Sequence, residues 1–176
     1  MAFIVEDGSG VLGATSYASL LLAQQYFEDR GVVEWENLNA EQQSEALIKG
    51  SSYADLRWGN ILRDRPLKDD QGLELPRKNL TDRYGRSITG LPTNWINGVL
   101  EYALIASQGG LYSDPIVNPD KEVKSERVVV GPITKDLTFV TSSGISNPSS
   151  FVEFTKPDNL CKAFTTARGM GGRVIV

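Results

Sequence analysis

The chain has 176 residues, enough for one ordinary domain, and its apolar (40%) and charged (23%) fractions are typical of a globular protein. It contains no histidine and a single cysteine, which excludes imidazole acid–base catalysis, a Ser-His-Asp triad, a thiolate zinc site and an intramolecular disulfide. The net charge of −4 argues against a protein that coats nucleic acid, because phosphate binding depends on lysine and arginine.

The first ten residues, MAFIVEDGSG, lack the basic start and the long apolar core of a secretory signal. Apolar runs such as residues 20–23 are far shorter than the roughly 18 residues that a membrane span requires. We therefore expect synthesis in the cytosol and no membrane contact, and the lone Cys161 fits a reducing compartment.

The first predicted helix follows Ser19, a residue type that favours the N-cap position. Apolar residues recur at helical spacing as far as Phe27, and Gly31 supplies a C-terminal stop. These signals predict a helix over residues 20–30, and a short connection follows it.

A second helix is predicted to begin after Asn39, which forms a weak capping box with Gln42, and to run to Trp58. Gly50 interrupts this helix at a cost of about 1 kcal/mol relative to alanine. A glycine at this position would let another helix approach closely.

Residues 59–91 are predicted to form a long connection that is rich in charges and turn residues. Structureless loops of more than about 15 residues are uncommon in compact domains unless they have a function. A third helix is predicted to begin with Pro92 at its first helical position and to end before Gly109.

Beyond Pro119 the pattern changes to alternation, which predicts a β-hairpin over residues 123–139 with its turn at 131–132. A polar linker (141–150), a short amphipathic helix (158–167) and a glycine-rich end follow. We therefore predict a mainly α fold with a small β part. Residues 1–140 would form a bundle of three to four helices with the hairpin, and residues 141–176 a linker and an extended C-terminal arm.

The last three residues, Val174, Ile175 and Val176, are strand-forming and follow a glycine-rich tether. Chain ends that fray are normally polar, so an apolar end suggests that it pairs with a strand edge. That edge could belong to the chain's own hairpin or to the sheet of a neighbouring molecule.

Acidic pairs are present, but each lies beside a turn or at a helix end, where solvated surface charge is expected rather than acid–base chemistry. These pairs are Glu28/Asp29, Glu34/Glu36 and Asp69/Asp70. We therefore expect a protein that is not an enzyme and that holds neither a cofactor nor a metal ion.

Basic residues concentrate in 57–86, where eight lysines and arginines face five acidic residues, a local balance of 8 − 5 = +3. With Trp58 and Tyr84 nearby, such a segment could bind single strands by stacking and charge. The interleaved carboxylates favour a salt-bridged loop or a subunit interface instead.

The order of these motifs resembles a family of tailed-phage structural proteins, the head–tail connector or adaptor proteins, some of which carry a DnaT-like single-strand-binding label. The residues that carry the resemblance are, in chain order, MAFIVEDGSG, ATSYAS, QQYFEDRG with Trp35, ALIKGSSYADLRW, LELPRKNLTDRYGRSITGLP, EYALIAS, VKSERVVVGPITKDLTF and a short helix with a glycine-rich tail. They span nearly the whole chain. The chain departs from the family pattern by extra residues around 140–157 and by Leu75, where many relatives have an aromatic residue.

The resemblance implies a ring, usually a dodecamer, that sits beneath the portal in the virion neck and receives a tail or stopper protein. DNA would pass through it without sequence-specific binding. By position, the resemblance implies a portal-contacting arm at Leu160, Phe164, Arg168, Arg173, Val174, Ile175 and Val176. It places an inter-subunit or lumen loop at Arg63, Arg65, Arg77, Arg83, Tyr84 and Arg86.

The alternative function is that of a single-stranded DNA-binding replication accessory protein, as the second label suggests. Its candidate DNA contacts are Arg57, Trp58, Arg63, Arg65, Arg77 and Tyr84. Such binding would weaken steeply with salt.

Overall fold

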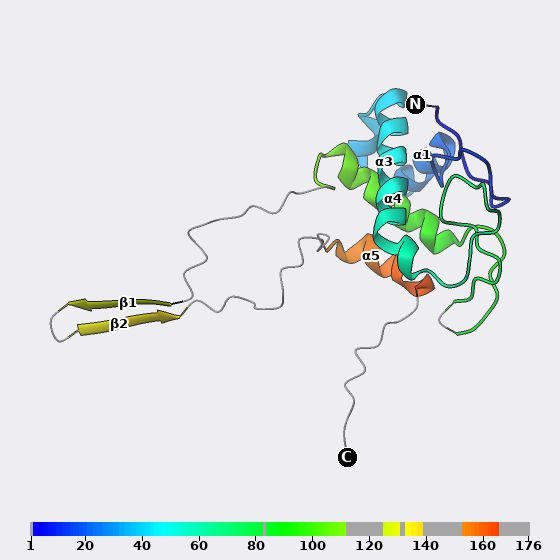
Figure 1. Cartoon of the computed structure of the whole chain (residues 1–176). Helices are drawn as coiled ribbons and strands as arrows, with labels where there is room; N and C mark the ends of the chain where they lie inside the picture. The colour runs from blue at the N-terminus through cyan, green and yellow to red at the C-terminus, as the bar shows by residue number, and fades with distance from the viewer. Residues whose placement is uncertain (1, 83, 112–124, 131–132, 139–152, 166–176) are drawn as a thin grey trace, which may run out of the picture. The chain divides into compact units, whose positions relative to one another are not determined.

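The computed structural model describes all residues except 1, 83, 112–124, 131–132, 139–152 and 166–176 (Figure 1). The described part contains five α-helices and one two-stranded sheet, which confirms the prediction of a mainly α fold with a small β part. The chain divides into two compact units, residues 1–111 with 153–176, and residues 112–152. This division differs from the predicted boundary at 140/141, because the short helix after the hairpin belongs to the helical unit.

Helix α1 (Leu20–Glu28) begins as predicted, with the Ser19 hydroxyl accepting a hydrogen bond from the Leu22 N–H at 3.2 Å. A short helix that the sequence did not predict, α2 (Val33–Glu36), follows it. Its Trp35 is fully buried against Phe27 of α1, with ring centroids 4.6 Å apart. The segment predicted as a connection thus becomes part of the core.

Helix α3 (Ala40–Trp58) has the predicted capping box between Asn39 and Gln42. The prediction for Gly50 is also confirmed, since a Cβ atom there would lie 2.7 Å from the Ala103 backbone nitrogen of α4. The absence of a side chain at position 50 therefore allows the two longest helices to pack backbone to backbone.

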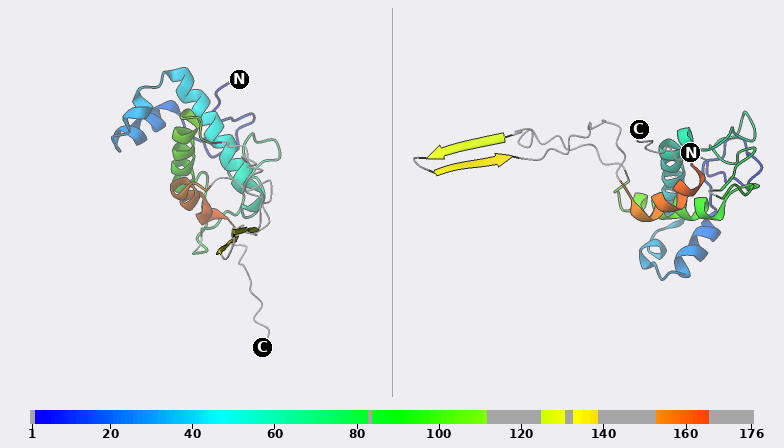
Figure 2. Two further views of the ribbon diagram at one scale, coloured as in Figure 1. Left: turned by 90° about the vertical axis from the view of Figure 1, so that its left-hand side faces the viewer. Right: turned by 90° about the horizontal axis from the view of Figure 1, so that it is seen from below.

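Helix α4 (Thr93–Ser107) begins one residue later than predicted. Pro92 is its N-cap rather than its first helical residue, because a backbone ψ of 132° keeps Pro92 extended. The helix packs against both α3 and α5 (Figure 2). Its buried residues include Trp95, Val99, Leu100, Tyr102 and Ala103.

One hydrophobic cluster joins α1 to α4. It consists of Ala18, Ala23, Tyr26, Phe27, Trp35, Ala46, Leu47, Leu100 and Ala103. Three of these residues are aromatic, so the cluster gains edge contacts between rings as well as buried area.

The short C-terminal helix, α5 (Thr155–Cys161), begins three residues before the predicted start and ends in a 3₁₀ turn, η3 (Lys162–Phe164). The Asp158 carboxylate accepts a hydrogen bond from the Phe154 N–H at 3.0 Å and so fixes the first turn. Buried Cys161 lies over Gly98 of α4, where a Cβ atom would be 2.5 Å from the cysteine sulfur. Burial raises the pKa of this thiol well above its usual range.

The second unit contains the predicted hairpin, formed by β1 (Ser125–Val130) and β2 (Ile133–Thr138). The strands are antiparallel, with Val130 opposite Ile133 and Arg127 opposite Asp136. The alternating pattern of the sequence therefore predicted both strands to within two residues.

Candidate functional site

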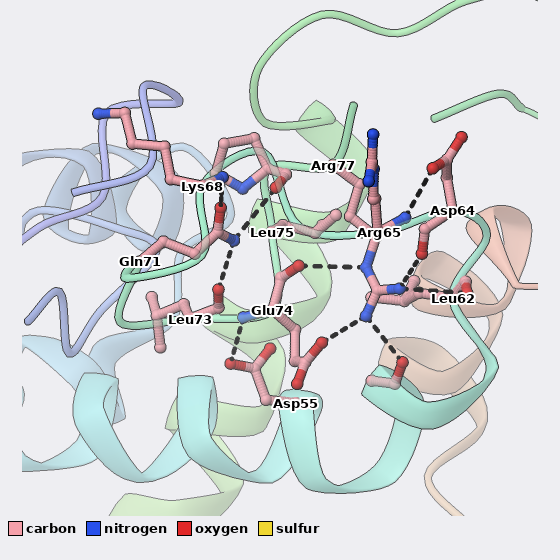
Figure 3. Close-up of polar contacts among 12 residues, drawn as sticks. Asp55, Leu62, Asp64, Arg65, Lys68, Gln71, Leu73, Glu74, Leu75 and Arg77 are labelled. Carbon is pink, nitrogen blue, oxygen red and sulfur yellow. Dashed lines mark hydrogen bonds and ion pairs between the residues drawn. The ribbon is translucent and has the colours of Figure 1, made fainter. Parts of the chain in front are cut away.

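The loop that follows α3 is organised by one buried guanidinium. The side chain of Arg77 donates to the backbone carbonyls of Gly59 (3.0 Å), Leu62 (3.4 Å) and Glu74 (3.2 Å), and also to that of Asp64 (Figure 3). It forms an ion pair with the Glu74 carboxylate as well. Arg77 is only 9% exposed. Its guanidinium therefore binds groups of the loop itself and is not accessible to solvent.

A carboxylate on α3 ties this loop to the helical body. Asp55 accepts a hydrogen bond from the Tyr17 hydroxyl at 2.5 Å and another from the Glu74 N–H at 3.1 Å. The Tyr17 hydroxyl in turn accepts from the Leu75 N–H at 3.0 Å. Asp55 therefore joins three segments that are distant in sequence: the N-terminal segment, α3 and the loop.

The N-terminal segment lies along the same loop (Figure 1). The Gly72 N–H donates to the Val11 carbonyl at 3.1 Å, and the Lys68 ammonium donates to the Gly10 carbonyl at 3.1 Å. A Cβ atom on Gly72 would lie 2.4 Å from the Ala14 backbone nitrogen, so only glycine fits at this crossing. The loop is thus bonded on two sides and belongs to the folded body.

Beside these contacts, a hollow of about 430 Å³ is lined by both charged and aliphatic groups. Its charged residues include Asp55, Lys68, Asp69 and Glu74, and Leu56 and Leu73 also line it. Burial raises the pKa of Asp55 to about 7, while the hydrogen bond from Tyr17 acts in the opposite direction. The hollow therefore contains one carboxyl that changes charge near neutral pH.

This raised pKa gives a testable pH dependence. Because the folded state holds the Asp55 proton more tightly than the unfolded state, this group's contribution to stability is complete below about pH 4 and is lost as the pH rises through about 7. We expect the unfolding free energy of the wild type, relative to Asp55→Asn, to fall by up to about 4 kcal/mol between pH 4 and pH 8. Urea unfolding at several pH values measures the difference.

The matched control is Asp69→Asn, which neutralises an exposed acid lining the same hollow. Three carboxyls with lowered pKa values, Asp7, Asp64 and Asp82, contribute stability that is lost only as the pH falls below their usual range, so they do not interfere. Parallel pH profiles for the wild type and Asp55→Asn would contradict the assignment.

Two further residues of the predicted DNA-binding set are also internal. Arg57 pairs with Asp158 of α5 at 2.5 Å, and only 10% of its side chain is exposed. Trp58 is 8% exposed, and its indole N–H donates to the Tyr102 hydroxyl at 2.9 Å. Together with Lys156, which pairs with Glu101 at 2.5 Å, these contacts lock α5 against α3 and α4.

The remaining residues of the predicted loop are more accessible. Arg63 is half-buried and donates to the Thr81 hydroxyl, while Arg65 is exposed. Arg86 pairs with Asp82 at 2.7 Å with 75% of its side chain exposed, and it lies over the ring of Tyr84. Arg83 falls outside the described residues. The structure therefore divides the predicted set into an internal half and a surface half.

An open groove of about 730 Å³ includes part of this surface half. Tyr84 and Arg86 line one part of it, and the start of α4 (Thr93, Asn94) and Phe164 line others. The groove is larger than the hollow beside Asp55, and its lining is mostly polar.

The predicted portal-contacting arm is divided by the structure. Phe164 is 4% exposed and Leu160 is half-buried, so both residues help to pack α5 and η3 onto the helical unit. Arg168, Arg173 and the three terminal residues Val174–Val176 lie outside the described residues. The role of these arm residues in contacting a portal stays a prediction.

Sequence reasoning did not identify the residues that hold the loop and α5 against the other helices: Tyr17, Asp55, Glu101 and Asp158. Tyr17 and Asp55 are 38 positions apart, and Arg57 and Asp158 are 101 apart, so no local motif signals either pair. Among the described residues, no group of three or more acidic or cysteine side chains could hold a metal ion. None of the described helices combines the length and the apolarity that crossing a bilayer requires.

Comparison with known proteins assigns the chain to a family. A family model described as "Putative DnaT-like ssDNA binding protein" matches residues 1–176. No curated protein and no solved structure matches the chain. Since the match covers the whole length, the chain belongs to this DnaT-like family.

Proposed function

We propose that this chain is a structural subunit of a tailed-phage head–tail connector, which forms a ring between the portal and a tail or stopper protein in the virion neck. The observation that carries this proposal is how the described part of the chain uses its arginines. Arg57 and Arg77 bind partners within the fold, so these two arginines of the predicted DNA-binding set are not available to bind phosphates. A conduit for DNA benefits from weak phosphate contacts, because tight ones would slow its passage.

Exposed aliphatic side chains add support. Leu21 is 77% exposed and its neighbour Leu22 is 42% exposed on α1, while Val33 on α2 is 58% exposed. Leu56 on α3 is 57% exposed at the edge of the 430 Å³ hollow. Apolar groups left in water on several helices suit a subunit that buries them against neighbouring molecules.

The test is electron microscopy of the purified protein, alone and with the portal protein of the same genome. We expect rings in which this chain is bound to the portal.

Removal of residues 173–176 is expected to abolish portal attachment while the helical unit keeps its unfolding temperature. A chain that never forms a ring, with or without the portal, would overturn the proposal.

The second candidate is single-stranded DNA binding, the function for which this DnaT-like family is named. The surface half of the loop supplies the groups for it: Arg65, Lys78, Tyr84 and Arg86 are exposed. Stacking of a base on one tyrosine, together with phosphate contacts from three cations, would give weak binding that is sensitive to salt.

Fluorescence anisotropy with a labelled oligothymidine in low salt decides between the two functions. Micromolar or tighter binding that is lost in Arg65→Ala/Arg86→Ala would establish the second function. The connector proposal expects no saturable binding at that concentration. Lys49→Ala, which removes an exposed cation from α3, is the matched control.

A further inference from the structure

The hairpin of the second unit has two unlike faces. In an antiparallel pair, directly opposed residues share a face, and so do residues two positions apart along a strand. The observed register places four aliphatic and two charged residues on one face: Val128, Val130, Ile133 and Leu137, with Glu126 and Lys135. The other face is mostly polar and carries Ser125, Arg127, Val129, Thr134, Asp136 and Thr138.

As described, this sheet is incomplete. It has two strands, so each of β1 and β2 has one outer edge without a paired strand in the described sheet. A two-stranded hairpin is marginally stable in water and normally needs a further strand or a packed surface. Neither strand contains a proline that would block an edge, and β1 ends in three consecutive valines, which favour pairing. The hairpin is therefore suited to extension by another strand.

We propose that a second copy of this chain supplies that strand: the outer edge of β2 in one molecule pairs with the outer edge of β1 in the next. In this arrangement, Arg127 of one copy lies opposite Asp136 of its neighbour and repeats the register within each hairpin. The inference deepens the proposed function, because it identifies the segment through which neighbouring ring subunits are joined.

The distribution of charge selects this head-to-tail pairing over two-fold pairing. Arg127 and Asp136 share a face, so a β2-to-β1 contact in this register keeps the aliphatic faces continuous and also opposes unlike charges. A two-fold β1-to-β1 contact that keeps the faces continuous either sets Arg127 against Arg127 or leaves it opposite an uncharged residue.

The two-fold β2-to-β2 contact fails in the same way. Three kinds of register keep the faces continuous. One places Lys135 opposite Lys135, another places Asp136 opposite Asp136, and in the others each charged residue lies opposite an uncharged one. Pairing Lys135 with Asp136 does oppose unlike charges, but it places the aliphatic face of one hairpin beside the polar face of the other.

Head-to-tail pairing also agrees with a ring. A contact between two different edges is heterologous, and repeating it closes into a ring when the rotation per subunit allows. The resulting antiparallel sheet would present Val128, Val130, Ile133 and Leu137 of every copy on one side and the mostly polar face on the other. A closed sheet leaves no free edge.

Two complementary charge reversals test the pairing. Arg127→Glu sets a glutamate against Asp136 at every contact between copies, and Asp136→Lys sets a lysine against Arg127. We expect each variant alone to weaken association by about tenfold per contact, because an attractive pair becomes repulsive. In an equimolar mixture, alternating copies oppose unlike charges at every contact, so assembly should recover.

The mixture separates contacts between copies from contacts within one hairpin. Both variants keep a like-charged pair inside their own hairpin, so recovery on mixing reports only the intermolecular contact. Sedimentation velocity and electron microscopy provide the readout, and Lys49→Glu on α3 controls for the change in net charge. The double variant Arg127→Glu/Asp136→Lys restores both kinds of pair and should assemble as the wild type does.

The outcomes distinguish this inference from the proposed function. Rings of the wild type that persist in either variant alone would overturn the hairpin contact and leave the connector function standing. Loss of assembly in both variants without recovery on mixing would also overturn it, because only the individual hairpins would then be affected. A wild type without rings overturns the proposed function itself.

Discussion

Replacing Arg77 with alanine is expected to lower the unfolding free energy by about 3–5 kcal/mol, because several charge-assisted hydrogen bonds from one buried guanidinium are lost. The substitution leaves the carbonyl groups of Gly59, Leu62, Asp64 and Glu74 without their shared donor. Since unmade hydrogen bonds of buried groups cost more than made ones contribute, the loop would detach from the end of α3. For a chain of this length, we expect the melting temperature to fall by about 10 °C.

Two variants make this result specific. Arg65→Ala removes an exposed arginine from the same loop and should change stability by less than about 0.5 kcal/mol. Arg77→Lys keeps the positive charge but not the planar fork of donors, so we expect it to restore only a minor part of the loss. If Arg77→Ala and Arg65→Ala unfold at the same urea concentration, the central role of Arg77 is contradicted.

The second large effect is expected at the crossing of α3 and α4. Gly50→Ala adds a methyl group 2.7 Å from the Ala103 nitrogen and 2.9 Å from the Val99 oxygen, both backbone atoms that cannot rotate away. The helices must move apart, and this overpacking opposes the roughly 1 kcal/mol that alanine gains in helix propensity. We expect the net free energy of unfolding to fall by about 1–3 kcal/mol. Gly50→Leu should abolish cooperative unfolding, which calorimetry and near-UV circular dichroism would detect.

Ser52→Ala, at an exposed position of the same helix, is the matched control. It gains a smaller amount of helix propensity at a solvent-exposed position, so it should be neutral or slightly stabilising. If Gly50→Ala proved as stable as Ser52→Ala, the close approach of the two helices would not limit the fold.

The Arg77 substitution also bears on function, because Arg77 organises the loop. Arg65, Tyr84 and Arg86 lie on a segment that Arg77 and Asp55 hold against α3. Either proposed function uses this segment as a surface, for a neighbouring subunit or for a DNA strand. We therefore expect Arg77→Ala to impair ring formation or DNA binding even at temperatures where the helices remain folded.

The local features of this fold were readable from the amino-acid sequence. Ser19 and the Asn39/Gln42 box mark helix starts because capping depends on residues within one turn of each other. The alternation around 131–132 identifies the hairpin for the same reason, since a strand pair joined by a tight turn is a local structure. Gly50 could be recognised as a close crossing because a glycine inside a helix has a known cost.

The tertiary structure alone decided what the charged residues do. The interleaved charges of the basic segment favoured salt bridges, but the sequence did not show which groups Arg57 and Arg77 bind: a carboxylate 101 positions away and a set of backbone carbonyls. Backbone carbonyls carry no sequence signature, and a long-range ion pair has no fixed spacing. Whether an arginine binds its own fold or another molecule therefore depends on which polar groups the folded chain leaves unpaired around it.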